Sequence, residues 1–180
     1  MEKQLDVNDK MRAILIDWLV EVHLKFKLMP ETLFLTVNLI DRYLAKEQIN
    51  RNRLQLLGVS AMQVASKYEE IYPPIVKDMV YITDNAYTRE EVLEMERCLL
   101  TALDFNISYN SQYRFLERIQ KLTMIDNPIV LNLAMYVLEL TLIQYKMLKY
   151  SPMILSAGAF YLSIRLTKTP FQAWNESVLG

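Results

Sequence analysis

Residues 11–22 read MRAILIDWLVEV, and this stretch is too apolar for an ordinary surface helix. A surface helix of a globular protein needs one apolar stripe, which faces the core. Nine of these twelve residues are apolar, and a single arginine, Arg12, stands among them. The stretch therefore predicts a helix that lies deep in a core, or one that carries a second apolar face for a partner.

On a helical wheel at about 100° per residue, the apolar residues divide into two arcs, and Arg12 projects into the second. The first arc contains Met11, Ile14, Leu15, Trp18 and Val22, and the second contains Ala13, Ile16, Leu19, Val20 and Phe26. If the second arc faces the core, Arg12 needs an acidic partner, because an unpaired buried guanidinium costs several kcal/mol. Asp41 is the only charged residue in the apolar stretch LFLTVNLID (33–41), so we predict a buried Arg12–Asp41 ion pair between the first two helices.

The first arc is surplus to that core, and periodicity leaves two interpretations of it open. An exposed cluster of Met, Ile, Leu and Trp is typical of a protein–protein interaction site. Alternatively, another helix of the same chain covers the arc. His23 falls on the core side of the same helix, and we expect a satisfied core histidine there rather than a pH switch.

Composition favours a binding module over an enzyme. The 180 residues are 52% hydrophobic, enough for one large domain or two small ones, each with a core. Twenty basic and 21 acidic residues give a net charge of −1, which offers no support for nucleic-acid binding. Only three glycines occur, which argues against a phosphate-binding loop, and one His with one Cys cannot form a zinc site. We therefore expect no catalytic residues, no cofactor and no metal.

Cysteine usage and hydropathy bear on the compartment. Cys98 is the only cysteine, so the chain cannot form an intrachain disulfide, and a reducing nuclear or cytosolic compartment is favoured. No apolar run reaches the length of a membrane span, and the first residues lack a secretory pattern, so we expect no membrane partner.

The composition of the chain predicts helices nearly throughout, because glycine is rare and helix-forming residues are abundant. The expected helices begin at Asn8 or Asp9 and run to about Lys27, then cover 30–45, 53–70, 75–82, 89–103, 112–122, 129–143 and 153–166, and a last one begins in 170–180. Capping residues and prolines set these boundaries.

An internal repeat divides the chain in two. A shift of 98 residues places Leu35 on Leu133 and Leu44 on Leu142, and sets LGVSAM (57–62) against LSAGAF (155–160). Chance similarity of two apolar helices is the alternative, but one offset serves both helices without a gap. We predict an all-α chain of two tandem five-helix domains, residues 1–107 and 108–180, the second cut short at its C-terminus.

Five segments together resemble the cyclin box of mitotic cyclins of the A and B types, with a leaning towards B. They are MRAILIDWLVEV (11–22), ETLFLTVNLIDRYL (31–44), LQLLGVSAMQVASKYEEIYPP (54–74), VYITDNAYT (80–88) and EVLEMERCLLTALDFNI (91–107). The resemblance covers residues 5–107 and, more loosely, 110–180 as a second cyclin box. It implies a double cyclin fold and a non-catalytic activator of a cyclin-dependent kinase at the G2/M transition, in the nucleus and cytoplasm.

The resemblance also implies two binding surfaces. Residues matching the family's contacts to the kinase αC helix, which the activator holds in its active position, are Lys67, Tyr68, Glu96, Leu100, Phe105 and Ile107. Residues matching a docking patch for Arg-x-Leu peptides of substrates and inhibitors are Met11, Ile14, Leu15, Trp18, Leu54 and Gln55. Glu21 stands beside Trp18 on the wheel, where its carboxylate could pair with the arginine of such a peptide.

Taken without the resemblance, these residues have plainer interpretations. Lys67 and Glu96 read as solvated surface charges, and Phe105 and Ile107 read as domain core. Rival functions are a transcription-factor or pocket-type cyclin fold, which binds DNA-associated proteins, a helical repeat scaffold, and an enzyme. Relative to mitotic cyclins, we expect this sequence to lack the long N-terminal region with its destruction signal and the final helices of the second box.

Overall fold

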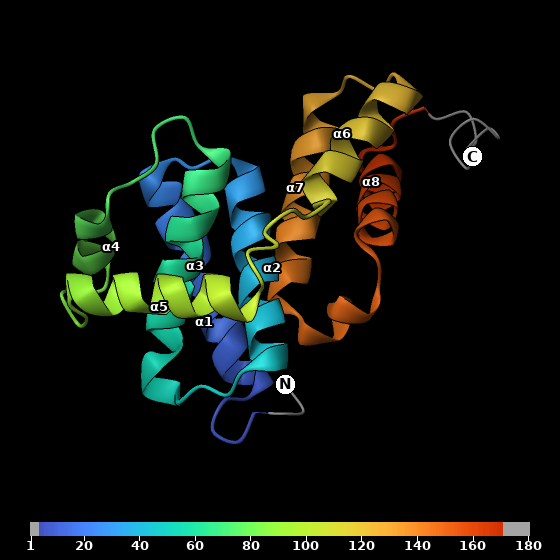
Figure 1. Ribbon diagram of the computed structural model, residues 1–180. Coiled ribbons are helices and arrows are strands. Elements are labelled where there is room, and N and C mark those ends of the chain that lie inside the picture. The colour runs from blue at the N-terminus through green and yellow to red at the C-terminus, as the bar shows by residue number, and fades with distance from the viewer. Residues whose placement is uncertain (1–3, 171–180) are drawn as a thin grey trace. The chain divides into compact units, whose positions relative to one another are not determined.

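The computed structural model describes residues 4–170, which form eight α-helices and two short 3₁₀ helices, with no strand among them (Figure 1). The chain divides into two compact units, Met1–Tyr109 and Asn110–Gly180. The prediction of an all-α chain is confirmed. Within residues 4–170 no helix is long and apolar enough to cross a membrane.

The first unit contains five α-helices, four of which pack around a buried central one. They are α1 (Asp9–Phe26), α2 (Pro30–Lys46), α3 (Leu54–Glu69, preceded by the 3₁₀ helix Arg51–Arg53), α4 (Val76–Ile82) and α5 (Arg89–Ala102). Helix α3 packs against the other four, and every residue from Leu56 to Ser66 is buried (Figure 1). Helix α3 is therefore the scaffold on which the surfaces of this unit are built.

The expected caps set the helix boundaries. The Asn8 side chain accepts a hydrogen bond from the Met11 amide at the start of α1. Thr88 and Glu91 form a reciprocal capping box at the start of α5, with distances of 2.8 and 3.2 Å. Pro30 occupies the first turn of α2, where its missing N–H costs nothing.

The structure contains the predicted Arg12–Asp41 ion pair between α1 and α2. The guanidinium donates through Nε to Oδ1 of Asp41 at 2.5 Å and through Nη2 to Oδ2 at 2.7 Å. The Arg12 side chain is 1% exposed and that of Asp41 is 14% exposed. Burial raises the pKa of the Asp41 carboxyl, and the Arg12 guanidinium opposes that shift. The pair is thus a bidentate contact taken almost entirely out of water.

A close approach of α1 to α3 corrects one expectation about the first arc of α1. A Cβ on Gly58 would lie 2.8 Å from Cδ1 of Leu15, so Leu15 occupies the space that glycine leaves. Leu15 and Val22, both placed in the surplus arc by the wheel, are buried in the core. Only part of that arc is open to solvent.

The three helices of the second unit correspond to the first three helices of the first unit. Its helices are α6 (Gln112–Thr123), α7 (Pro128–Ile143) and α8 (Pro152–Thr167), with a 3₁₀ helix at Tyr145–Lys149, and α8 packs against α6 and α7. The offset of 98 residues places α3 on α8, so Gly58 corresponds to Ser156. Ser156 is buried and donates from Oγ to the Gln112 carbonyl of α6 at 2.7 Å. The expected helix in 170–180 falls almost wholly outside the described residues.

Candidate functional site

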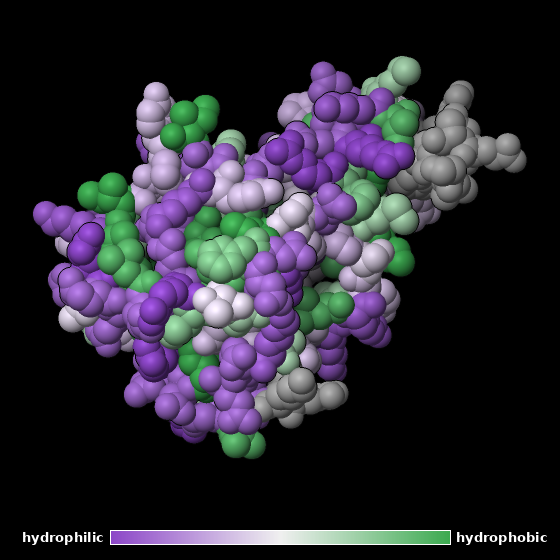
Figure 2. All heavy atoms as spheres, viewed as in Figure 1, coloured by the Kyte–Doolittle hydropathy of each residue, from purple (hydrophilic) through white to green (hydrophobic). Residues whose placement is uncertain are grey.

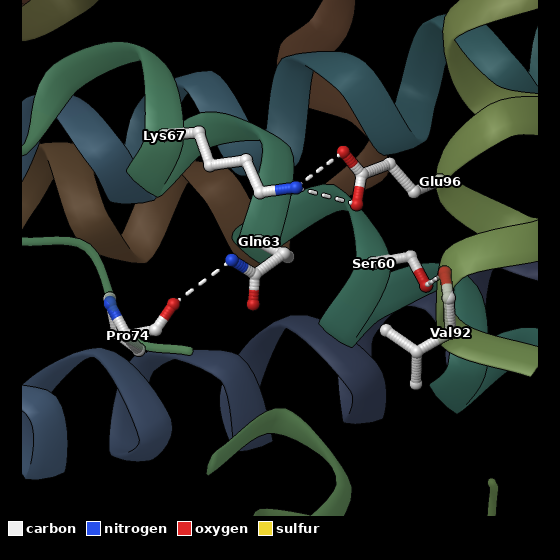
Figure 3. A network of polar contacts seen from close by, with 6 residues as sticks. All are labelled: Ser60, Gln63, Lys67, Pro74, Val92 and Glu96. Atoms are coloured by element: carbon white, nitrogen blue, oxygen red, sulfur yellow. Dashed lines mark hydrogen bonds and ion pairs between the residues drawn. The ribbon is translucent and has the colours of Figure 1, made fainter. Parts of the chain in front are cut away.

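Lys67 of α3 and Glu96 of α5 form an ion pair on the surface of the first unit (Figure 3). The ammonium donates to both carboxylate oxygens, at 2.6 and 2.8 Å. The Glu96 side chain is only 15% exposed, while that of Lys67 is 44% exposed. The interpretation of Glu96 as a freely solvated charge therefore does not describe this structure.

Two further hydrogen bonds fix the backbone around this ion pair (Figure 3). Ser60 of α3 donates from Oγ to the Val92 carbonyl of α5 at 3.2 Å. Gln63 donates from Nε2 to the Pro74 carbonyl at 2.9 Å, which ties the segment before α4 to α3. The side chains displayed here consequently stand on a rigid base.

The apolar residues assigned to this surface differ in exposure. Tyr68 is exposed, and Leu100 and Ile107 are half-buried against the core. Phe105 is 69% exposed, so the plain interpretation of Phe105 as domain core is wrong. These four side chains and the ion pair all belong to α3, to α5 or to the turn that follows α5.

The loop between α3 and α4 displays apolar side chains that the sequence analysis did not assign to a site. Ile71 is 85% exposed and Tyr72 is 91% exposed, and Ile75 is exposed as well. Figure 2 shows apolar side chains in green on this loop. Its base is held by Glu70, whose Oε1 accepts hydrogen bonds from the Met29 amide at 2.7 Å and from Thr32 Oγ1 at 2.5 Å. The signal available in the sequence was apolar residues beside Pro73 and Pro74, which keep the segment out of a helix.

The turn after α5 has a twin within the same unit. Each turn contains two consecutive residues in the left-handed region. In the turn after α4 these are Asp84 and Asn85, with φ of 56° and 59°, and in the turn after α5 they are Asp104 and Phe105, with φ of 53° and 56°. The amide of the second residue donates to a helix carbonyl five residues earlier in both turns, at 3.2 Å for Asn85 and 2.9 Å for Phe105. The two turns thus have the same backbone conformation and the same hydrogen bonds, but different side chains.

The comparison of the turns makes Phe105 an anomaly. Asparagine adopts the left-handed region at little cost, so Asn85 suits its position. A bulky phenylalanine in that region is strained, by about 1–2 kcal/mol on general grounds. Phe105 also leaves most of its ring in water. A left-handed residue is a common way to end a helix, and Lys27, Met124 and Lys168 do so here, so folding explains the backbone of the turn. The exposed aromatic ring is the feature that folding does not explain.

The docking patch is smaller than the residue set assigned to it. Ile14 is 71% exposed, Glu21 is exposed, and Met11, Trp18 and Gln55 are half-buried. Leu15 and Leu54, by contrast, are buried in the core of the first unit, so these two assignments to an open surface are wrong. The open apolar part of the patch consists of Ile14 with the edges of Met11 and Trp18.

His23 is buried between α1 and the α1–α2 turn. Its Nε2 lies 3.1 Å from the Met29 carbonyl, and burial lowers the pKa of its imidazole. Its Nδ1 is buried without a hydrogen-bond partner among the described residues, so His23 is a core residue but only half satisfied. Among residues 4–170 there is no cluster of His, Cys, Asp or Glu that could hold a metal ion.

Comparison with known proteins places these features in a family. Residues 1–108 match the model of the cyclin N-terminal domain, and residues 111–180 match that of the cyclin C-terminal domain. The chain is 51% identical over 177 residues to cyclin-B2-2 of Arabidopsis thaliana and 48% identical over 177 residues to G2/mitotic-specific cyclin-2 of Medicago sativa. It covers 41% and 53% of the lengths of these relatives.

A solved structure agrees with these sequence matches. A viral cyclin from herpesvirus saimiri superposes with a TM-score of 0.88 at 26% identity, covering 96% of this chain and 77% of that one.

Proposed function

This chain belongs to the cyclin family, and we propose that it is a regulatory subunit that binds and activates a cyclin-dependent Ser/Thr kinase at the G2/M transition. The contact surface is the Lys67–Glu96 ion pair with the apolar residues around it. The observation that carries the proposal is Phe105, whose aromatic ring is 69% exposed on a left-handed turn. A partner that buries the ring supplies a reason for its exposure, which the isolated fold does not.

The mechanism we propose is a shift of population rather than a chemical step of this chain. A protein kinase is active only when a lysine of its β3 strand pairs with a glutamate of its αC helix. A rigid surface that binds the αC-in state better than the αC-out state moves the equilibrium by the difference in affinity. A change from 1:99 to 99:1 needs about 5.5 kcal/mol.

The exposed apolar side chains can supply a difference of that size. Anchors of this kind contribute about 2 kcal/mol or more each when they fill pockets at the centre of an interface. Phe105 and Tyr68 are candidates, and Ile71 and Tyr72 extend the surface onto a loop that Gln63 and Glu70 hold in place. We place this complex in the nucleus and cytoplasm, as the family resemblance implies.

The double substitution Lys67→Ala with Glu96→Ala tests the kinase-binding surface. We expect weaker co-purification with a cyclin-dependent kinase and lower histone phosphorylation, because both polar contacts to the kinase helix are lost. Both partners are removed together, so no charge is left unpaired, and the melting temperature is expected to change little. Arg97→Ala with Glu94→Ala, an exposed pair on the same α5 helix, is the matched control. Full activation of the kinase by the first variant would refute the assignment.

A second surface on α1 supports a docking function beside activation. We propose that Ile14, with the edges of Met11 and Trp18, binds the leucine of Arg-x-Leu segments in substrates and inhibitors. The exposure of Ile14 at 71% favours this role, because the other large apolar residues on that side of α1 are buried or half-buried. Glu21 lies one turn beyond Trp18, where its carboxylate can pair with the arginine of the segment.

Trp18→Ala is expected to reduce phosphorylation of Arg-x-Leu substrates while leaving short peptide substrates unaffected. Because Trp18 also packs against the core, Ile14→Ser serves as a second variant that removes an exposed side chain only. Leu24→Ser, an equally exposed leucine on α1, is the control that should affect neither substrate class. The measurement is the ratio of kcat/KM for the two classes, and an equal loss for both would contradict the docking role.

A further inference from the structure

We infer that Arg42 and Lys46 of α2 are positioning residues that hold Phe105 in its binding conformation. The inference rests on the proposed kinase-binding function, to which it adds two residues outside the contact surface. They lie four positions apart on α2 and so project from the same face of that helix.

Both side chains bind backbone carbonyls on either side of Phe105. Lys46 donates from Nζ to the Ala102 carbonyl at 2.7 Å, where α5 ends. Arg42 donates to the Asn106 carbonyl at 2.7 Å, one residue after Phe105. Lys46 also contacts the Asp104 carboxylate at 3.1 Å. The left-handed pair Asp104–Phe105 is thereby fixed from α2 at both of its ends.

The Ala102 carbonyl is one of those that the end of α5 leaves without an internal partner. Cations near a helix C-terminus are also favoured by the helix dipole. Lys46 therefore has a physical reason to stay at the end of α5, although half of its side chain is exposed.

An open groove between α2 and α5 explains why such a contact is needed. The groove has a volume of about 850 Å³ and is lined by residues of both helices and of the turn after α5, including Tyr43, Lys46, Cys98, Thr101 and Asp104. Lys46 spans it to reach the end of α5. The turn is anchored on its other side by Leu103, which is buried in the core.

A strained turn persists only where its surroundings determine it. When the two cations are removed, we expect Phe105 to leave the left-handed region for part of the time. An apparent dissociation constant rises by the inverse of the competent fraction, so a fraction of one tenth weakens binding about tenfold.

The test uses Arg42→Met with Lys46→Met in the full chain, which removes both donors and keeps the apolar stems. In the free chain, amide exchange measured by NMR is expected to approach the unprotected rate at residues 104–106, because a competent fraction of one tenth leaves their hydrogen bonds open for about nine tenths of the time. Residues 84–86, the twin turn, serve as the internal control and should be unchanged. A general loss of stability would accelerate both turns, and unchanged exchange at 104–106 would overturn the inference.

Kinase binding supplies the second measurement. The double variant is expected to raise the dissociation constant for a recombinant cyclin-dependent kinase about tenfold. In a Phe105→Asn background the same two substitutions should have no further effect, because they act only through that side chain. An equal loss in both backgrounds would contradict the positioning role.

Two controls separate the possible failures. Arg97→Met removes a cation from the same groove that pairs with Glu94 of its own helix, and it should change neither measurement. Lys46→Arg retains a donor at this position, so its exchange rates at 104–106 and its affinity for the kinase should stay close to those of the parent chain. If the parent chain binds no such kinase, the proposed function fails, and the exchange experiment on the free chain still decides the positioning inference.

Discussion

Arg12→Ala is expected to lower the free energy of unfolding of the first unit by roughly 3–5 kcal/mol, because it leaves a buried carboxylate without its partner. Asp41 receives two charge-assisted hydrogen bonds from Arg12 and is only 14% exposed. For a unit of this size the melting temperature should fall by more than about 10 °C. Thermal and urea denaturation of the variant measure both quantities.

Removal of the other partner is expected to differ in its pH dependence. Asp41→Ala leaves Arg12, which cannot lose its proton, in the core, so its deficit should persist at every pH. In Arg12→Ala the Asp41 carboxyl can be neutralised instead. Burial already raises its pKa, and loss of the opposing cation raises it further. The folded pKa then lies above the unfolded value, so the deficit of Arg12→Ala shrinks as pH falls through that folded pKa.

Two control variants test whether the loss of stability comes from breaking a buried ion pair. Arg51→Ala breaks a well-formed pair with Asp6 on the surface, where both side chains meet solvent, and should leave the melting temperature nearly unchanged. Replacement of both buried partners, as Arg12→Met with Asp41→Leu, should recover much of the stability. An unchanged melting temperature for Arg12→Ala would show that the pair is not a structural requirement.

Local rules predicted the helices well because their signals are local. Caps such as Asn8 and Thr88, and prolines such as Pro30, act within one turn of the chain, so the sequence contains what is needed. The Arg12–Asp41 pair was predictable for a related reason. A charge in an apolar helix must be neutralised, and the apolar stretch 33–41 of the neighbouring helix offered one acid, Asp41.

Periodicity could not decide which part of an apolar helix is covered. Ile14 and Leu15 are neighbours in the same predicted arc, but Ile14 is exposed and Leu15 is buried. The difference comes from Gly58, forty-three residues further along the chain (58 − 15 = 43), whose missing side chain admits Leu15. A wheel describes one helix, whereas burial depends on the shape of its neighbour.

Phe105 shows the same limit at the candidate site. Hydrophobicity alone assigns a phenylalanine to the core. Its exposure follows from a left-handed turn, and no glycine or asparagine at the position signals such a turn in the sequence. The twin turn carries that signal in Asn85. The equivalence of Asp104–Phe105 to Asp84–Asn85 becomes visible only when the backbone hydrogen bonds of the two turns are compared. The family resemblance found Phe105 for a different reason, its place in a motif.

Phe105→Asn is expected to abolish most of the kinase affinity without any loss of stability. The ring is 69% exposed, so folding loses little buried area, and asparagine relieves a left-handed strain of about 1–2 kcal/mol. The loss of an aromatic anchor at the centre of an interface costs about 2 kcal/mol or more, which is roughly thirtyfold in the dissociation constant. Calorimetry of the free chain and titration with the kinase measure the two effects separately.

Phe105→Ala and Phe105→Gly separate the contact from the strain. All three variants lack the ring, so their affinities for the kinase should be equally low. Their stabilities should differ, since alanine keeps the left-handed penalty whereas asparagine and glycine relieve it, and we expect alanine to be the least stable of the three. A binding loss that instead followed stability across the series would mean that Phe105 supports the fold. An affinity that is indifferent to the ring while stability rises would leave its strain without a function, because the twin turn shows that Asn85 forms this backbone without it.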